Sequence, residues 1–257
     1  MSLLLREETG HIARLTLNSP ENYNALSSAM IAELHGQLDT IAEDDGIRVL
    51  IIAARGRAFC AGHDLHEMQG FRKESDGGRE SLARLFAQCS DMMQALADLP
   101  QPVIAEVQGI ATAAGCQLVA SCDLAVAADG ARFGVNGIDL GLFCATPMVA
   151  LTRAIPPRAA FELLVTGQFA DAETARQLGL VNRVTAPQDL TAQTMALAET
   201  IAAKQPQAVR MGKRAFRQQL SLGLAEAYEL AGRTICENAM LPDTERAMQG
   251  FIDRRQG

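Results

Sequence analysis

The stretch GIATAAGCQLVASCD, residues 109–123, decides the interpretation of the whole chain. It follows an apolar run, residues 102–107, whose β-branched side chains favour a strand. Residues 109–115 are nearly all small, and residues 115–121 have the character of a helix start. A strand, a tight turn and a helix N-terminus together direct unpaired amides and a positive dipole end at a bound group. Alone, such a stretch favours a tightly packed α/β core without a ligand.

A second stretch, FCAGHDL at residues 59–65, changes this balance. It also follows a buried-strand pattern, residues 49–53, and it also turns on small residues. Two strand ends with close-approach turns can each supply one amide to a single oxygen. The sequence therefore predicts an anion or oxyanion site where the two turns meet.

Composition restricts the kind of protein. At 257 residues the chain suits one domain with a helical appendage. The formal net charge of −7, without a basic patch, argues against a nucleic-acid partner. No apolar run reaches the length of a membrane span, and residues 1–10 do not resemble a signal peptide. We expect a bacterial-type cytoplasmic protein with no membrane partner.

The six cysteines form no CxxC pair and have no partnering histidine spacing. In a chain of this kind cysteines are most often buried small hydrophobes. Neither a metal site nor a disulfide framework is expected.

Hydrophobic periodicity predicts an α/β fold followed by helices. The first fifty residues suggest strand, helix and strand, residues 70–80 suggest a mobile surface loop, and the sequence after residue 157 suggests helix after helix. We divide the chain into a core that contains the two turns and their predicted oxyanion site, residues 1–190, and a helical oligomerisation region, residues 191–257. The predicted strands are residues 11–17, 47–53, 102–107, 123–128 and 132–134, and the predicted helices are residues 27–41, 80–96, 143–154, 158–165, 171–178, 187–203, 206–220, 222–238 and 243–255.

Several motifs together resemble the crotonase family, the enoyl-CoA hydratase/isomerase superfamily. The resemblance runs from about residue 5 to the C-terminus and looks closest to a mitochondrial-type, hydratase-domain-containing subgroup. It implies a spiral of ββα turns followed by helices that trimerise, in a homotrimer or a dimer of trimers. The motifs are Asn24-Ala25-Leu26, residues 59–65 and 109–123, Arg132-Phe133-Gly134, Gly141-Leu142, Thr166-Gly167, and residues 172–175 and 178–181.

The resemblance implies a role for each predicted site residue. An acyl-CoA thioester carbonyl would become an enolate-like oxyanion held by the backbone amides of His63 and Ala114. Coenzyme A would enter as part of the substrate, with no permanently bound cofactor. Backbone around four residues would cup the adenine, and two residues of the last helix would reach a neighbouring subunit's nucleotide. These are Ala25, Ala61, Asp64 and Leu65, and then Phe251 and Arg254.

The chain departs from the family at both acid–base positions. Hydratases of the family use two glutamates, whose places hold Gln117 and Gly137 here. Glutamine can hold a water molecule but cannot take its proton, and glycine can do neither. Asp139 is a candidate replacement, because the missing side chain at Gly137 would leave room for it; its alternative is an ordinary loop residue packed elsewhere.

Two classes of function remain open at this point. One is an enolate-forming enzyme, a hydratase or an isomerase, hydrolase or decarboxylase of the superfamily that acts in fatty acyl-CoA metabolism. The other is a CoA-ester-binding protein with weak or no hydratase activity. If only the acids are missing, Gln117→Glu with Gly137→Glu is expected to raise hydration. The lesser candidates for chemistry are Glu67, His66 and Cys144. The side chain of His63 is either a partly exposed loop imidazole or an acid or substrate contact.

Overall fold

The computed structural model describes residues 2–254 and is built on a six-stranded sheet. The first two strands form an antiparallel hairpin, and every other neighbouring pair is parallel. The predicted α/β class is confirmed. In sheet order the strands are β1 (Leu4–Thr9), β2 (Ile12–Leu17), β3 (Val49–Ala54), β5 (Val103–Val107), β7 (Leu124–Ala128) and β10 (Arg183–Thr185).

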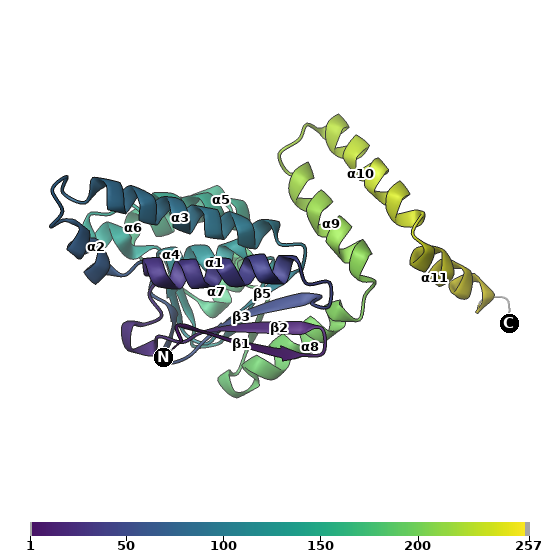
Figure 1. Cartoon of the computed structure of the whole chain (residues 1–257), viewed down its shortest axis with the longest axis horizontal. Helices are drawn as coiled ribbons and strands as arrows, with labels where there is room; N and C mark the ends of the chain where they lie inside the picture. The colour runs from purple at the N-terminus through teal and green to yellow at the C-terminus, as the bar shows by residue number, and fades with distance from the viewer. Residues whose placement is uncertain (1, 255–257) are drawn as a thin grey trace.

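Helices cover both faces of this sheet (Figure 1). On one face, α1 (Ser28–Ala42) and α3 (Arg79–Asp98) enclose the main core with alternate residues of β3, such as Leu50 and Ile52. On the other face, α8 (Leu190–Ala202) packs on Val49 and Ile51 of the same strand. Because side chains of a strand alternate between faces, the continuous apolar run of β3 serves both layers.

A second, four-stranded sheet positions the site. Its strands β4, β6 and β8 run parallel, so their carboxyl ends meet at one edge, and β9 closes the sheet antiparallel to β8. Helix α4 (Ala114–Ser121) starts directly behind β6. The strands are β4 (Ala58–Cys60), β6 (Ile110–Thr112), β8 (Arg132–Gly134) and β9 (Ala170–Asp171).

Shorter helices complete the core around these two sheets. They are α2 (Leu65–Phe71), α5 (Ala145–Ala154), α6 (Pro157–Thr166) and α7 (Ala172–Leu178), with the 3₁₀ helices η1 (Pro20–Asn22), η2 (Asn136–Leu140) and η3 (Pro187–Asp189). None of the helices of residues 2–254 is both long enough and apolar enough to span a bilayer.

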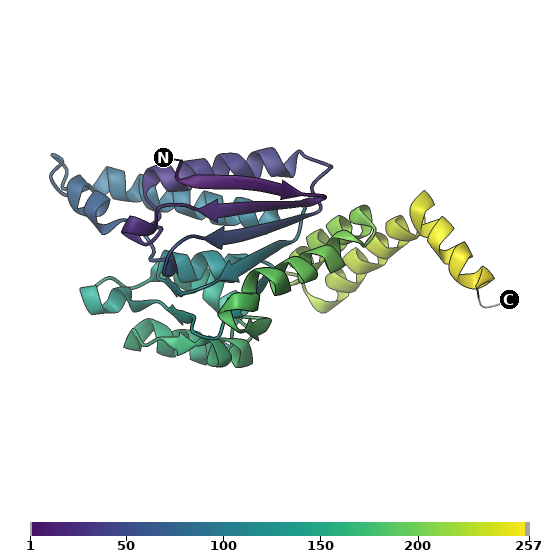
Figure 2. The same ribbon diagram turned by 90° about the horizontal axis from the view of Figure 1, so that it is seen from below.

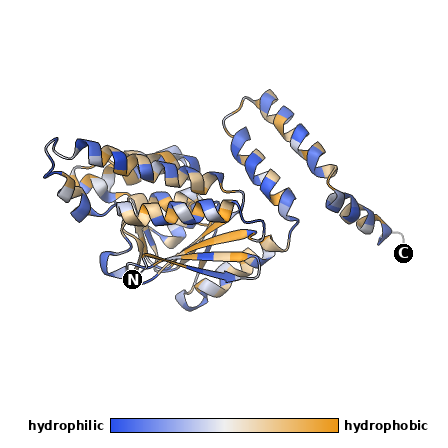
Figure 3. Ribbon diagram, viewed as in Figure 1, coloured by the Kyte–Doolittle hydropathy of each residue, from blue (hydrophilic) through white to orange (hydrophobic). Residues whose placement is uncertain are grey.

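The last three helices leave the core. Figures 1 and 2 show α9 (Pro206–Gln219), α10 (Leu224–Ala239) and α11 (Pro242–Asp253) extending away from the sheets. None of their described residues is buried, although apolar side chains alternate with polar ones along them (Figure 3). Helix α8, which we placed in the helical region, lies against the sheet, so the projecting part starts after Ala202.

Two sequence predictions of local structure were incomplete. The first fifty residues contain a further strand, β1. The sequence did not indicate it, because residues 3–8 lack the alternation that marks a half-buried strand. The predicted loop at residues 70–80 contains the end of α2, which begins at Leu65 under the cap of Asp64. The last predicted helix is present as α11, and its final residue, Arg255, lies outside the described residues.

Candidate active site

The predicted turns after β4 and β6 lie in direct contact. Gly62 has a φ of +87°, and a Cβ built on it would lie 2.8 Å from the Cβ of Ala113 and 3.1 Å from the amide nitrogen of Ala114. The same Cβ would lie 3.2 Å from the carbonyl oxygen of Thr112. Only glycine therefore fits between the turns, both for its backbone conformation and for the space available.

The small residues of the central stretch have a structural reason. A side chain on Gly115 would collide with the backbone of Cys60, because the start of α4 packs in direct contact with β4. Ala113 takes the strained combination of φ 50° and ψ −122°, and its amide donates to the carbonyl of Gly134 at 3.0 Å. This turn makes Ala114 the first residue of α4, where backbone amides have no partner within the helix.

The side chain of His63 is held from two sides. Its Nδ1 lies 3.2 Å from the carbonyl oxygen of Leu26, and its ring meets Phe86 of α3 edge-on, with centroids 5.3 Å apart. The other ring nitrogen, Nε2, is buried without a hydrogen-bond partner among the described residues. Burial lowers the pKa of His63 below its usual 6.5, opposed by the Leu26 carbonyl and the Glu67 carboxylate.

Gln117 lies on α4 one turn beyond Ala114. The residue is 5% exposed, and its Oε1 has no hydrogen-bond partner within residues 2–254. It lines a hollow of about 390 Å³ between α3, α4 and α5. Residues of the hollow along α3 are Ser90, Met93, Gln94 and Ala97, and α5 contributes Thr146, Val149, Ala150 and Arg153.

The space beside Gly137 is already occupied. A Cβ on Gly137 would lie 2.6 Å from the carbonyl oxygen of Leu142 and 2.8 Å from the Sγ of Cys144. Cys144 is 9% exposed, and burial raises the pKa of its thiol. The room that we assigned to Asp139 does not exist, since a backbone carbonyl and this thiol fill it.

Asp139 itself faces a different neighbour. Its carboxylate oxygens lie 2.9 and 3.1 Å from the position of a Cβ on Gly167, at the end of α6, and the residue is exposed. The structure does not bring it to the paired turns. Of the lesser candidates, Glu67 accepts a hydrogen bond from the amide of Ser28 at 2.9 Å, and His66 is exposed.

The predicted adenine-binding backbone comes from two segments that are hydrogen-bonded to each other next to the turns. The amide of Leu26 donates to the carbonyl of Gly62 at 2.7 Å, and that of Ala61 donates to Tyr23 at 3.1 Å, so Ala25 lies beside the 61–65 turn. The side chain of Asp64 accepts from the first amides of α2 and is therefore a helix cap. Leu65 is half exposed.

Sequence analysis quoted Asn24 as part of a motif without a role for its side chain, and it missed the pair of Tyr23 and Arg57. The fully buried Asn24 donates from its side chain to the carbonyls of Arg55 and Ala58, both at 2.9 Å. The Arg57 guanidinium lies 4.6 Å from the ring centroid of Tyr23 on the exposed side. The positive φ of Tyr23 and Asn24 is rare for non-glycine residues, and nothing in a single sequence announces it.

The two nucleotide contacts predicted on the last helix lie elsewhere within one chain. Phe251 belongs to α11 and Arg254 follows its end, and α11 projects away from the core (Figure 2). Phe251 lines a small hollow with residues of α9 and α10.

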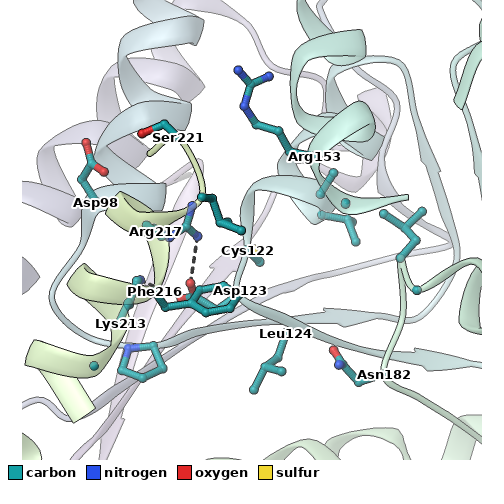
Figure 4. A pocket seen from close by; sticks show the side chains of 18 residues that line it. Asp98, Cys122, Asp123, Leu124, Arg153, Asn182, Lys213, Phe216, Arg217 and Ser221 are labelled. Carbon is teal, nitrogen blue, oxygen red and sulfur yellow. Dashed lines mark hydrogen bonds and ion pairs between the residues drawn. The ribbon is translucent and has the colours of Figure 1, made fainter. Parts of the chain in front are cut away.

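A larger groove of about 960 Å³ separates α9 from the core (Figure 4). Asp123 accepts hydrogen bonds there from Lys213 Nζ at 2.7 Å and from Arg217 at 2.8 Å. The side chain of Lys213 is only 8% exposed, and burial lowers its pKa while the Asp123 charge raises it. These hydrogen bonds connect α9, the first projecting helix, to the residue that precedes β7.

Known proteins share both the sequence and the architecture. The family model for enoyl-CoA hydratase/isomerase matches residues 7–257. The enoyl-CoA hydratase domain-containing protein 3, mitochondrial, of Danio rerio is 40% identical over 255 residues, which cover 99% of this chain and 86% of that protein. A putative enoyl-CoA hydratase of Thermus thermophilus is 32% identical over 252 residues, covering 98% of each.

Solved structures extend the same relationship. A crystal structure of enoyl-CoA hydratase from Mycobacterium smegmatis is 50% identical with a TM-score of 0.95, covering 99% of this chain and 97% of that one. The human domain-containing protein 3 superposes with a TM-score of 0.94 at 38% identity, and the match covers 98% of each chain. The paired turns, the two sheets and these matches agree, and the chain belongs to the enoyl-CoA hydratase/isomerase family.

Proposed function

We propose that the protein is an enzyme that acts on acyl-CoA and enoyl-CoA thioesters through an enolate. The thioester carbonyl accepts hydrogen bonds from the backbone amides of His63 and Ala114, which hold the oxyanion as it forms. The observation that carries this proposal is the contact between the two turns at Gly62, where an added Cβ would lie 3.1 Å from the amide nitrogen of Ala114. One such amide typically contributes about 2.7–4 kcal/mol to a transition state of this kind.

The CoA moiety lies along the segment next to these turns. Ala25 lies there beside the segment of Ala61, Asp64 and Leu65, and the half-exposed Leu65 leaves an open face for an adenine ring. CoA is then part of the substrate rather than a resident cofactor. We assign the reaction to the hydratase/isomerase type, in fatty acyl-CoA metabolism of the cytoplasm.

Titration calorimetry with butyryl-CoA, paired with a proton-exchange measurement, tests this proposal. We expect butyryl-CoA to bind and its α-protons to exchange with D₂O, detected by mass spectrometry, because a held enolate exchanges its α-proton. Binding without exchange would reduce the protein to a CoA-ester-binding protein. Absence of binding would overturn the proposal.

We further propose that the protein works as a homotrimer or a dimer of trimers. The support is the projecting helices, whose large apolar side chains lack cover within one chain, among them Phe216, Tyr228 and Ile235. In such an assembly Phe251 and Arg254 approach a neighbouring subunit's nucleotide. Sedimentation equilibrium should give a mass of three or six chains, and Tyr228→Asp with Ile235→Asp should shift it toward one. A monomeric parent at micromolar concentration would overturn the assembly.

A further inference from the structure

Two buried hydrogen-bond acceptors beside the paired turns have no partner in the described part of the chain. The first is Nε2 of His63: since Nδ1 faces the Leu26 carbonyl at 3.2 Å, Nδ1 carries the proton and Nε2 has the lone pair. The second is Oε1 of Gln117, in a residue that is only 5% exposed. A buried acceptor without a donor is costly, so each calls for a donor that these residues do not supply.

The two acceptors belong to adjoining segments that helix α3 follows. Helical side chains lean toward the N-terminus of their helix, so Gln117 leans toward Ala114, whose amide is next to Gly62 and His63. Helix α3 runs alongside both: Phe86 touches the His63 ring, and one and two turns further Ser90 and Gln94 line the hollow with Gln117.

We propose that Nε2 of His63 and Oε1 of Gln117 together hold the water molecule that adds to an enoyl-CoA, with His63 as the base. Water has two protons to donate, and the pair offers two acceptors. This inference rests on the proposed function, because the enoyl thioester must be held by the amides of His63 and Ala114.

The step balances with the substrate and water alone. Nε2 takes one proton from water while the water oxygen forms a bond to the β-carbon, and the double-bond electrons move onto the thioester oxygen. The enolate then collapses, and its α-carbon takes the proton back from Nε2. Gln117 orients the water and exchanges no proton.

The surroundings of His63 suit a base at neutral pH. Burial keeps the imidazole neutral, with a pKa below 6.5. The charged group that acts on it is Glu67 of α2, whose carboxylate already accepts from the Ser28 amide, while the contacts from α3 and from Leu26 are Phe86 and a carbonyl. The family's other acid position, Gly137, has no side chain and no free space.

Kinetics of crotonyl-CoA hydration test the pair. In His63→Gln the backbone amide remains and the new amide group can still donate to Leu26, so butyryl-CoA should bind as in the parent while kcat falls at least about 100-fold. Gln117→Leu should lower kcat less, and the double variant should be no slower than His63→Gln, because both residues serve one water. His35→Gln on α1 and Gln88→Leu on the exposed side of α3 are matched controls that should keep the parent rate.

Two further readouts separate proton transfer from a structural role. In the parent, kcat should rise with pH to a plateau with a midpoint below 6.5, and added imidazole should restore part of the rate of His63→Ala. An unchanged kcat in His63→Gln would overturn the inference. So would a parent that binds butyryl-CoA but hydrates crotonyl-CoA no faster than buffer, which leaves the proposed thioester binding standing. A parent that binds no acyl-CoA would overturn the proposed function itself.

Discussion

The thiol of Cys144 lies where a side chain on Gly137 would have to start, 2.8 Å from the Cβ position, with the Leu142 carbonyl at 2.6 Å on another side. The space beside residue 137 is therefore closed from two sides. With Cys144 and the Leu142 carbonyl in these places, the chain has no room for any residue larger than glycine at 137.

Restoring the carboxylate at residue 137 is thus expected to fail. Gly137→Glu forces the Leu142 backbone to move and should lower the free energy of unfolding by about 1–3 kcal/mol, the usual cost of overpacking. The double variant with Gln117→Glu should then hydrate crotonyl-CoA no faster than the parent, contrary to the expectation from sequence. Thermal unfolding and initial rates measure both effects. A Gly137→Glu protein with the parent's melting temperature would contradict the crowding.

Gly62→Ala is expected to damage both stability and activity. The added methyl group would meet Ala113 and the Ala114 amide at a φ of +87°, so the turns must separate and one of the two proposed oxyanion donors is displaced. We expect a fall in kcat of about 100- to 1,000-fold. Gly36→Ala in α1 is the control, because a Cβ there has nothing within 4 Å. This variant should keep full activity, and its free energy of unfolding should rise by about 0.5–1 kcal/mol. Equal activity of the two variants would rule out the close contact as the reason for Gly62.

The attachment of α9 depends on its buried ion pair. Asp123→Ala leaves the Lys213 ammonium, whose side chain is 8% exposed, without its carboxylate. The free energy of unfolding should fall by an amount near the lower end of about 3–5 kcal/mol. Hydrogen exchange of the α9 amides should accelerate. Asp45→Ala is the matched control, since it removes a pair between Arg210 of α9 and a carboxylate that is 93% exposed, worth about 0–1 kcal/mol. A larger loss of stability in Asp45→Ala than in Asp123→Ala would show that the contact of Arg210 with Asp45, rather than the buried ion pair, holds α9.

His63 also predicts how stability depends on pH. Its pKa is lower in the folded protein than the unfolded value of 6.5, so the unfolded chain binds its proton first as the pH falls. Stability should be full above pH 6.5 and fall as the pH drops from 6.5 toward the folded pKa, by at most about 1.4 kcal/mol per pH unit. Urea unfolding across this range should show a shallower slope in His63→Gln than in His35→Gln. Identical slopes would mean that the ring is protonated without cost.

Sequence reasoning located the two turns because their chemistry is local. The small residues around Ala114 and Gly62 follow from backbone packing, and a run of small residues after an apolar strand indicates that packing in a single chain. The helices were likewise predictable from their period, as with α1 and its Ser27 cap. Element types were accurate wherever the pattern was long.

The parts that sequence did not predict depend on distant contacts. That Cys144 fills the place beside Gly137 depends on the return of the chain after Gly141, and no local pattern shows it. The three-residue strand β4 exists only because β6 pairs with it across some fifty residues, and a strand that short has no readable alternation. The interpretation of Asp139 as a replacement acid, which we held beside that of an ordinary loop residue, depended on the same contact.

The crossing of α8 over the sheet has a consequence for synthesis. The large sheet is complete only when β10 has paired with β7 and α8 has covered its second face, and both elements end by Ala202. The projecting helices leave the ribosome after these elements, so the part with the paired turns can fold while they are still emerging. In the proposed assembly, covering their apolar faces is a separate event between chains. The resistance of α10 to proteases should then rise with protein concentration while that of the core should not.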